Sequence, residues 1–126
     1  MREGDDQLEA LSINIFVKNM KIRCCVGYGC QESDAVEKKD AFWGYLDNEV
    51  IEATKAGSGL LIQMDGNLWA GKEIIPNDPR PQNRNGRLFA QFLNQNSHLS
   101  VVNALDLCEG LITRRYHVGG NSRRVF

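Results

Sequence analysis

Residues 60–67 read Leu60-Leu61-Ile62-Gln63-Met64-Asp65-Gly66-Asn67, a nearly continuous apolar run that ends in a polar turn. A short apolar run that follows a helix predicts a strand covered on both faces and central in its sheet. Side chains at the end of such a strand point into the crevice where ligands gather. The Asp65 carboxylate can activate water and the Asn67 amide can donate to a phosphoryl oxygen, so the pair suits phosphodiester hydrolysis. By itself, Asp-Gly-Asn also suits an ordinary turn.

Two segments near the N-terminus, Leu11–Val17 and Lys21–Tyr28, are rich in β-branched and aromatic residues. Lys18-Asn19-Met20 between them favours a turn, so the segments predict a hairpin. The domain is predicted to span residues 11–126. Residues 1–10, which contain an acidic stretch, are predicted to be an N-terminal extension.

Between the hairpin and the apolar run, residues recur at three- and four-residue steps that predict an amphipathic helix. Asp34 and Glu37 are spaced like a capping box at its start, and Gly57 is placed to stop it. Trp43 and Phe42 are expected to pack in the core rather than to stack on bases. The residues that recur are Val36, Lys39, Trp43, Leu46, Val50 and Thr54.

The segment Leu68–Arg84 contains all three prolines of the chain and predicts a long functional or mobile loop. A second helix is predicted to begin near Asn85. A further strand is predicted at Leu99–Ala104, and another is predicted to begin in Leu111–Arg114. The resulting order, β-β-α-β-loop-α-β-β, predicts an α/β protein of the α+β type, with a mixed sheet and flanking helices.

The charge of the chain is unevenly distributed. Its 126 residues, enough for one domain or part of one, have a net charge of −1. Residues 1–63 have a net charge of −4 and residues 64–126 have a net charge of +3. The second half is therefore the better candidate to face an anion. Its arginines either offset phosphate charge or simply form a solvated face.

The four cysteines show no C-x-x-C spacing, which argues against a zinc or redox site. They are expected to be free thiols in a reducing compartment. The neighbours Cys24 and Cys25 should point to opposite faces of a strand. No apolar run is long enough to span a bilayer, so we expect an intracellular protein, nuclear or cytoplasmic, that does not contact a membrane.

Six short motifs occur in order along the chain. They are Val26-Gly27-Tyr28-Gly29-Cys30-Gln31, Phe42-Trp43-Gly44-Tyr45-Leu46, Met64-Asp65-Gly66-Asn67, Asn83-Arg84-Asn85-Gly86-Arg87-Leu88-Phe89, Leu99-Ser100-Val101-Val102-Asn103 and Cys108-Glu109-Gly110-Leu111-Ile112-Thr113-Arg114. In this order they resemble the endonuclease domain of LINE-type (non-LTR) retrotransposons, in the endonuclease/exonuclease/phosphatase superfamily. Two positions depart from the family pattern, since Cys30 replaces a proline and Met64 replaces a glycine.

The resemblance implies a DNase I-like fold, a four-layered α/β sandwich, and Mg²⁺-dependent nicking of DNA. It implies that Asp65 activates the attacking water, that Asn67 stabilises the pentavalent phosphorus and that the Tyr28 hydroxyl contacts the phosphate. The metal ligands are unknown beyond Asp65 and Asn67. Weaker candidates for substrate contacts are Asn85, which also suits a helix cap or loop tether, Arg87 and Arg114. In a full-length parent the domain would be joined to a reverse transcriptase.

The family's metal-binding Asn and Glu and its catalytic Ser-Asp-His motif have no match in this sequence. We therefore expect a central part of the domain that binds Mg²⁺ weakly and is inactive by itself. An uncovered sheet face in such a partial domain should favour self-association. The alternatives are a non-catalytic remnant or interaction module, and a phosphatase of the same superfamily that acts on a small phosphoester.

Overall fold

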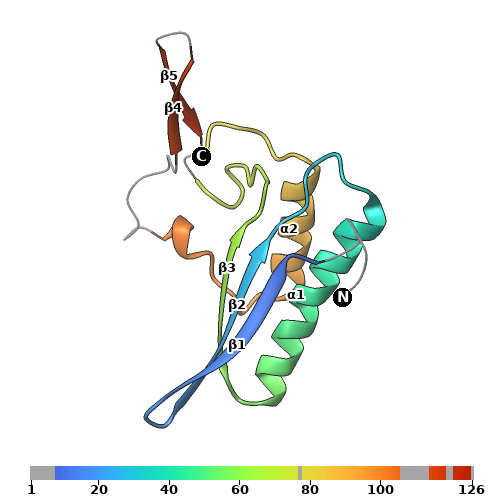
Figure 1. The fold of residues 1–126 in the computed structure, drawn as a ribbon, viewed down its shortest axis with the longest axis vertical. Helices are drawn as coiled ribbons and strands as arrows, with labels where there is room; N and C mark the ends of the chain where they lie inside the picture. Colours follow the sequence, from blue (N-terminus) through green and yellow to red (C-terminus); the bar gives the residue numbers. More distant parts are fainter. Residues whose placement is uncertain (1–7, 77, 106–113, 119–120, 126) are drawn as a thin grey trace.

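The computed structural model describes residues 8–76, 78–105, 114–118 and 121–125 (Figure 1). A sheet of three strands in the order β1-β2-β3 is its centre. β1 and β2 are antiparallel, whereas β2 and β3 are parallel, so the sheet is mixed and the fold is of the α+β class. The elements that build this part are β1 (Ala10–Val17), β2 (Met20–Tyr28), α1 (Val36–Lys55), β3 (Gly59–Asp65) and α2 (Arg84–Gln95).

The predicted hairpin is confirmed. Val17 pairs with Met20 across a two-residue turn, in which Lys18 has a φ of 53°. Turns of this length need positive φ values because these match the twist of the two strands. The alternation along β2 also places Cys25 fully inside and leaves Cys24 half-buried, as expected for neighbours on a strand.

The first helix is also confirmed, but its predicted capping box is wrong. α1 begins at Val36 after Ala35, which makes no side-chain cap. The Asp34 carboxylate turns back toward the preceding loop, where it accepts a hydrogen bond of 2.7 Å from the Gln31 amide. Gly57 follows the C-cap residue Ala56 and has a φ of +64°, in the left-handed region that favours glycine, and therefore acts as the predicted stop.

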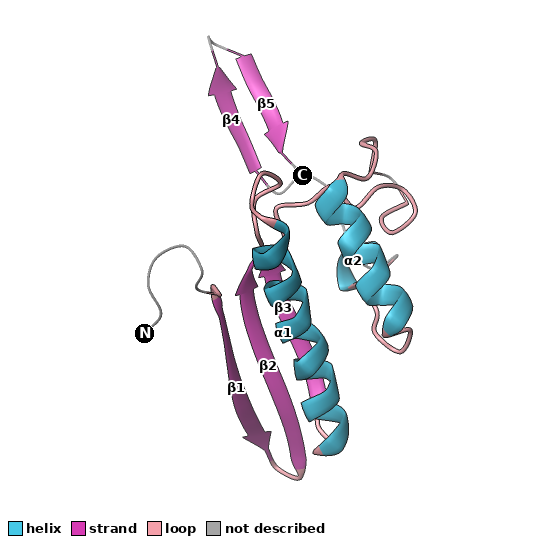
Figure 2. Cartoon of the chain, turned by 90° about the vertical axis from the view of Figure 1, so that its right-hand side faces the viewer, coloured by secondary structure: helices cyan, strands magenta, loops and turns pink. Residues whose placement is uncertain are grey.

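Both helices pack on the same face of the sheet (Figure 2). Phe42 of α1 is 1% exposed. Its ring meets the Trp43 ring edge-on, and the two ring centroids are 5.3 Å apart. Trp43 in turn contacts Phe89 and Phe92 of α2, with ring centroids 6.0 and 5.6 Å apart. The prediction that Phe42 and Trp43 pack in the core is thus confirmed. No helix in the described residues has both the length and the apolarity needed to cross a membrane.

The prediction for β3 is wrong in two respects. The strand forms where residues 60–64 predict it, but within the described residues it lies at an edge of the sheet and only one of its faces is covered. Leu60, Ile62 and Met64 pack toward the helices, whereas Leu61 is 43% exposed on the other face. The strand is neither central nor covered on both faces, because both helices lie on the same side.

The second helix is confirmed, but the strand predicted at Leu99–Ala104 is wrong. That segment contains a short 3₁₀ helix, η2 (Val102–Ala104), and pairs with no described strand. Farther along, β4 (Arg114–Val118) and β5 (Asn121–Val125) form a separate antiparallel hairpin. Residues 111–113 of the last predicted strand lie outside the described residues, and Arg114 begins β4.

A buried polar cluster joins α1 to the hairpin. Glu49 is 4% exposed, and its carboxylate accepts hydrogen bonds from the Ser12 hydroxyl at 2.5 Å and from the Arg23 guanidinium. The Ser12 and Tyr45 hydroxyls are 2.6 Å apart. Burial by itself would raise the pKa of Glu49, but the hydrogen bonds from Arg23, Ser12 and Tyr45 outweigh it and lower the pKa below its usual value.

We expect this cluster to make stability depend on pH. Because the pKa of Glu49 is lowered by folding, its contribution is present above the unfolded pKa of about 4.3 and is lost as the pH falls through the folded value. Urea unfolding between pH 3 and 7 should therefore show stability falling at the acidic end. Glu49→Gln should flatten this fall and lower the free energy of unfolding at pH 7 by about 1–3 kcal/mol.

The matched control is Glu52→Gln on the same helix, whose side chain is 48% exposed. This variant should keep the pH profile of the wild type. A Glu49→Gln profile as steep as that of the wild type would contradict the assignment.

Candidate functional site

The ends of two neighbouring strands bring Tyr28 and Asp65 together. β2 and β3 are parallel, and their register pairs Tyr28 directly with Asp65 at the last position of each strand. Residues paired on adjacent strands point to the same face of a sheet. The Tyr28 ring is 48% exposed and Asp65 is also exposed, so a phenol and a carboxylate stand side by side and open to solvent.

Asn67 joins these strand ends. Its backbone has a φ of 47°, and its amide N–H donates to the Asp65 carboxylate at 3.2 Å, which closes a tight turn through Gly66. Its side-chain Nδ2 donates to the Gly29 carbonyl at 2.7 Å. The structure thus brings Tyr28, Asp65 and Asn67, the three predicted catalytic residues, to one end of the sheet. One Nδ2 hydrogen of Asn67 is used in this tether and one remains.

The two strand ends approach each other very closely. The Gly29 amide donates to the Asp65 carbonyl at 2.6 Å. A Cβ atom on Gly29 would lie 2.6 Å from the Gly66 carbonyl oxygen, so a larger residue at position 29 would push the loops apart. This glycine stands between Tyr28 and Cys30, and it allows the phenol and the carboxylate to lie on neighbouring backbones.

The start of α2 holds both loops in place. Asn85 is 2% exposed, and its Nδ2 donates to the Cys30 carbonyl at 2.8 Å and to the Asn67 carbonyl at 3.1 Å. This geometry is that of a loop tether, one of the two structural roles considered for Asn85. The helix cap is Asn83, whose Oδ1 accepts from the amides of Gly86 at 2.8 Å and Trp69 at 3.1 Å.

Glu32 is a site-supporting residue that the sequence does not reveal. Its carboxylate accepts from the Arg84 amide at 2.9 Å and from the Asn85 amide at 3.1 Å, and it therefore places negative charge at the N-terminus of α2. A carboxylate is favoured there by the free N–H groups and the helix dipole. Arg87 lies exposed on α2, and Arg114 is the first residue of β4.

The long loop folds back on itself. Asp78 is 6% exposed and accepts from both the amide and the Nε of Arg80, at 3.0 and 3.3 Å. The Arg80 guanidinium lies over the Trp69 ring, 5.1 Å from its centroid. Trp69 remains 44% exposed near the polar turn after β3. The loop therefore presents a partly exposed aromatic ring two residues after Asn67.

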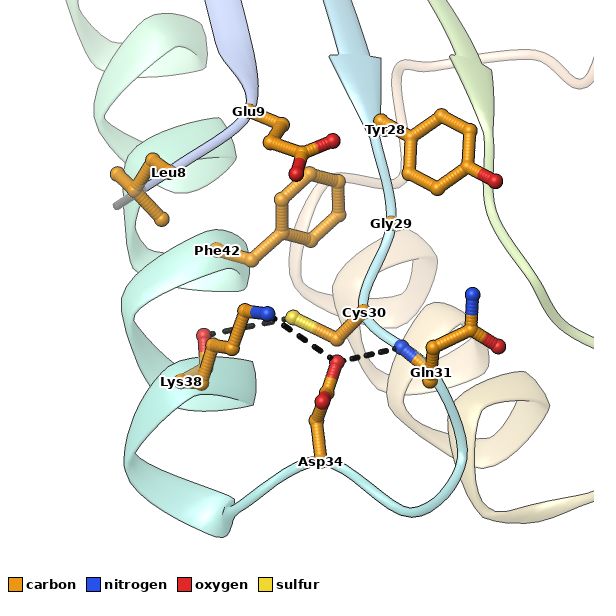
Figure 3. Close-up of a pocket in the computed structure, with 9 residues that line it drawn as sticks. All are labelled: Leu8, Glu9, Tyr28, Gly29, Cys30, Gln31, Asp34, Lys38 and Phe42. Atoms are coloured by element: carbon orange, nitrogen blue, oxygen red, sulfur yellow. Dashed lines mark hydrogen bonds and ion pairs between the residues drawn. The ribbon is translucent and has the colours of Figure 1, made fainter. Parts of the chain in front are cut away.

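A pocket of about 120 Å³ lies on the other side of Tyr28 (Figure 3). Cys30 lines this pocket, and the Cys30 thiol donates to the Lys38 carbonyl at 3.6 Å. The Lys38 ammonium forms an ion pair with the Asp34 carboxylate at 3.4 Å. Burial raises the pKa of the Cys30 thiol, and the nearby Asp34 carboxylate raises it further. The Tyr28 ring points away from the Cys30, Lys38 and Asp34 side chains in Figure 3. Tyr28 nevertheless lines this pocket, so it borders both the pocket and the strand end that carries Asp65.

Among the described residues, no three His, Cys, Asp or Glu side chains gather in a way that could hold a metal ion. The oxygen atoms available at the strand ends are those of Asp65 and Asn67, which are of the type that Mg²⁺ prefers. No family model matches the chain, and neither a curated protein nor a solved structure matches it. The geometry of the strand ends is the structural feature that bears on function.

Proposed function

We propose that this chain carries part of the active site of a Mg²⁺-dependent DNA endonuclease of the LINE-type retrotransposon class. In the same proposal, the three-stranded sheet and its two helices are one half of a DNase I-like four-layered sandwich. The observation that supports it best is the pairing of Tyr28 with Asp65, with Asn67 tied to both strand ends. The parent protein would join this domain to a reverse transcriptase.

Each residue has a separate role in the proposed hydrolysis. The Asp65 carboxylate takes a proton from water as the water oxygen forms a bond to phosphorus. The remaining amide hydrogen of Asn67 and the Tyr28 hydroxyl donate to phosphate oxygens, where negative charge develops. The leaving oxygen departs with the electron pair of the broken P–O bond and takes a proton from solvent. Both donors are held on strand ends, so little reorganisation is needed.

Mg²⁺, when bound, would neutralise charge on the phosphate, with Asp65 Oδ and Asn67 Oδ1 as its protein ligands. This ion prefers octahedral oxygen coordination and keeps several water molecules in most sites. Two protein oxygens are few for tight binding. The described residues therefore fit a weak Mg²⁺ site, consistent with a catalytic centre to which further residues contribute.

The openness of the site favours a polymer over a small phosphoester. Asp65 lies at an exposed strand end and lines neither the pocket beside Cys30 nor the pocket beside His98. Small ligands are usually bound in concave pockets that bury most of their surface. A DNA backbone, in contrast, can lie across an open edge with exposed donors and an exposed aromatic ring such as Trp69.

The test is nicking of supercoiled plasmid DNA in the presence of Mg²⁺. Because the chain carries only part of the active site, we expect a trace of nicking at most, which EDTA abolishes and Asp65→Ala reduces to background, since loss of a general base removes about 10²- to 10⁴-fold in rate. Asp40→Ala is the matched control, because Asp40 is an exposed aspartate on α1 and is not part of the two strand ends. This variant should nick at the rate of the wild type.

Three results would contradict the proposal or change it. Nicking that survives Asp65→Ala would remove Asp65 from the mechanism. Absence of any metal-dependent nicking by the folded wild type would favour a non-catalytic remnant or interaction module. Hydrolysis of a small phosphoester without cleavage of DNA would favour the phosphatase alternative.

A further inference from the structure

We propose that the exposed indole of Trp69 is a stacking platform for an unpaired base of the DNA strand that is cut. Such a contact extends the proposed endonuclease site and rests on that function. Trp69 follows Asn67 by two residues on the loop after β3. An extended chain advances by at most about 3.6 Å per residue, so the Cα atoms of Asn67 and Trp69 are no more than about 7 Å apart. That length is about two nucleotide steps along a DNA strand, at about 3.4 Å each.

The guanidinium of Arg80 supports one face of the Trp69 ring. It lies over the ring, 5.1 Å from the centroid, and its Nε donates to the buried Asp78 carboxylate at 3.3 Å. Trp69 is still 44% exposed with this support in place. A base can therefore approach the ring from the face that the guanidinium does not occupy, and the three flat groups would then form one stack.

The backbone of Trp69 is fixed to the start of α2. The Trp69 amide donates to the Asn83 Oδ1 atom at 3.1 Å, and the Trp69 carbonyl accepts from the Asn83 amide at 3.4 Å. A Cβ atom on Gly86 would lie 1.9 Å from the Trp69 carbonyl oxygen, so the helix and the loop are in close backbone contact. A tryptophan side chain has only two torsions left to fix, so stacking on this ring costs little conformational entropy.

The charge near the ring suits a nucleic acid. Residues 68–87 contain four basic and two acidic side chains, a net charge of +2. Arg84 and Arg87 are exposed at the start of α2, where they can offset phosphate charge on the strand whose base stacks. The exposed Glu73 and Asp65 carboxylates oppose this attraction, and Mg²⁺ at Asp65 would reduce the opposition.

Stacking on Trp69 requires a base that has left the duplex stack. In an intact duplex the neighbouring bases cover both faces of each base, so an aromatic side chain stacks on single strands or on bases that have been extruded. The chain should therefore prefer single-stranded or locally opened DNA. Negative supercoiling favours such opening, which suits the plasmid used to test nicking. The contact tolerates any sequence, because every base has a flat face.

The first test is the affinity for a fluorescein-labelled oligothymidine of about 12 nucleotides, measured by anisotropy in EDTA so that no hydrolysis occurs. Trp69→Ala should weaken binding by about 5- to 150-fold, the loss typical of one base–aromatic stack. Trp69→Phe keeps a flat ring and should stay within about threefold of the wild type. Phe16→Ala is the matched control, because Phe16 is a 71% exposed aromatic residue near the tip of the hairpin. This variant should bind as the wild type does.

Tryptophan emission of the wild type gives a second measurement that does not depend on the folding of any variant. The unlabelled oligothymidine should quench this emission and protect it from acrylamide. Trp69→Phe should bind the oligonucleotide without this change in emission. Trp43, which packs against Phe42 in the core, remains in both proteins and shows whether the fold is kept.

Three results would overturn the platform. They are no binding of the oligothymidine by the folded wild type, binding without quenching, and a Trp69→Ala variant that binds as tightly as the wild type. None of them decides the proposed hydrolysis, because nicking is measured with Mg²⁺ and depends on Asp65. Quenching together with weaker binding by Trp69→Ala, but without any nicking, would uphold the platform and contradict the enzyme.

Discussion

Phe42→Ala is expected to lower the free energy of unfolding by about 3–5 kcal/mol, which is most of the stability of a small domain. Phe42 is 1% exposed and packs between the sheet and the two helices. Its ring lies over Gly27, where an added Cβ would be 3.3 Å from Cε2, and meets Trp43 edge-on. Truncation removes these contacts and leaves a cavity that glycine at position 27 cannot fill.

Urea unfolding followed by tryptophan fluorescence would measure this effect, because Trp43 contacts the ring that is removed. Phe16→Ala is the matched control, since Phe16 is 71% exposed near the tip of the hairpin and should change stability by less than about 0.5 kcal/mol. Equal effects of the two variants would show that Phe42 is not at the centre of the core.

The helices and the hairpin could be predicted because their signals are local. A helical period from Val36 to Val50, a glycine at position 57 and two β-rich segments on either side of a short turn each need only neighbouring residues. The failed capping box shows the limit of such signals. Asp34 has the right spacing, but its carboxylate bonds to Gln31 in the preceding loop, which competes with the helix for the same side chain.

The covering of β3 could not be predicted for a different reason. A strand with one open face usually shows alternating apolar and polar residues, but here Leu61 on the open face is as apolar as Leu60 and Ile62 toward the helices. Composition is also an incomplete guide for Leu99–Ala104. Its composition favours a strand, yet a strand needs a partner, and no described strand pairs with it.

The candidate site could be predicted in part. The Asp65-Gly66-Asn67 turn is a local feature, and the position of Tyr28 beside Asp65 follows once β2 and β3 are parallel. The contacts of Glu32 with the start of α2 span 52 and 53 residues and leave no local signal. The sequence therefore indicates the chemical groups of the site but not the groups that hold them.

Asn85→Asp is expected to be among the most damaging single-atom changes in the chain. The Asn85 amide nitrogen donates to two carbonyls, those of Cys30 and Asn67, from a position that is 2% exposed. A carboxylate of the same shape would turn an oxygen toward both carbonyls. Within the described residues, the Oδ1 atom of Asn85 has no hydrogen-bond partner. The charge of a buried carboxylate at this position would therefore remain without a donor. We expect a loss of about 3–5 kcal/mol in the free energy of unfolding at pH 7.

Asn85→Ala should cost less, about 2–4 kcal/mol, because it leaves the two carbonyls unsatisfied but introduces no charge. Asn94→Asp on the same helix is the matched control, since Asn94 is exposed and the same substitution there should have almost no effect. Urea unfolding of the three variants ranks their losses of stability, and hydrogen exchange shows which part of the chain is affected. If Asn85 holds the strand ends together, the amide of Gly29, which donates to the Asp65 carbonyl, should exchange faster in Asn85→Ala. If exchange at Gly29 does not change while stability falls, Asn85 anchors α2 without positioning Tyr28 and Asp65.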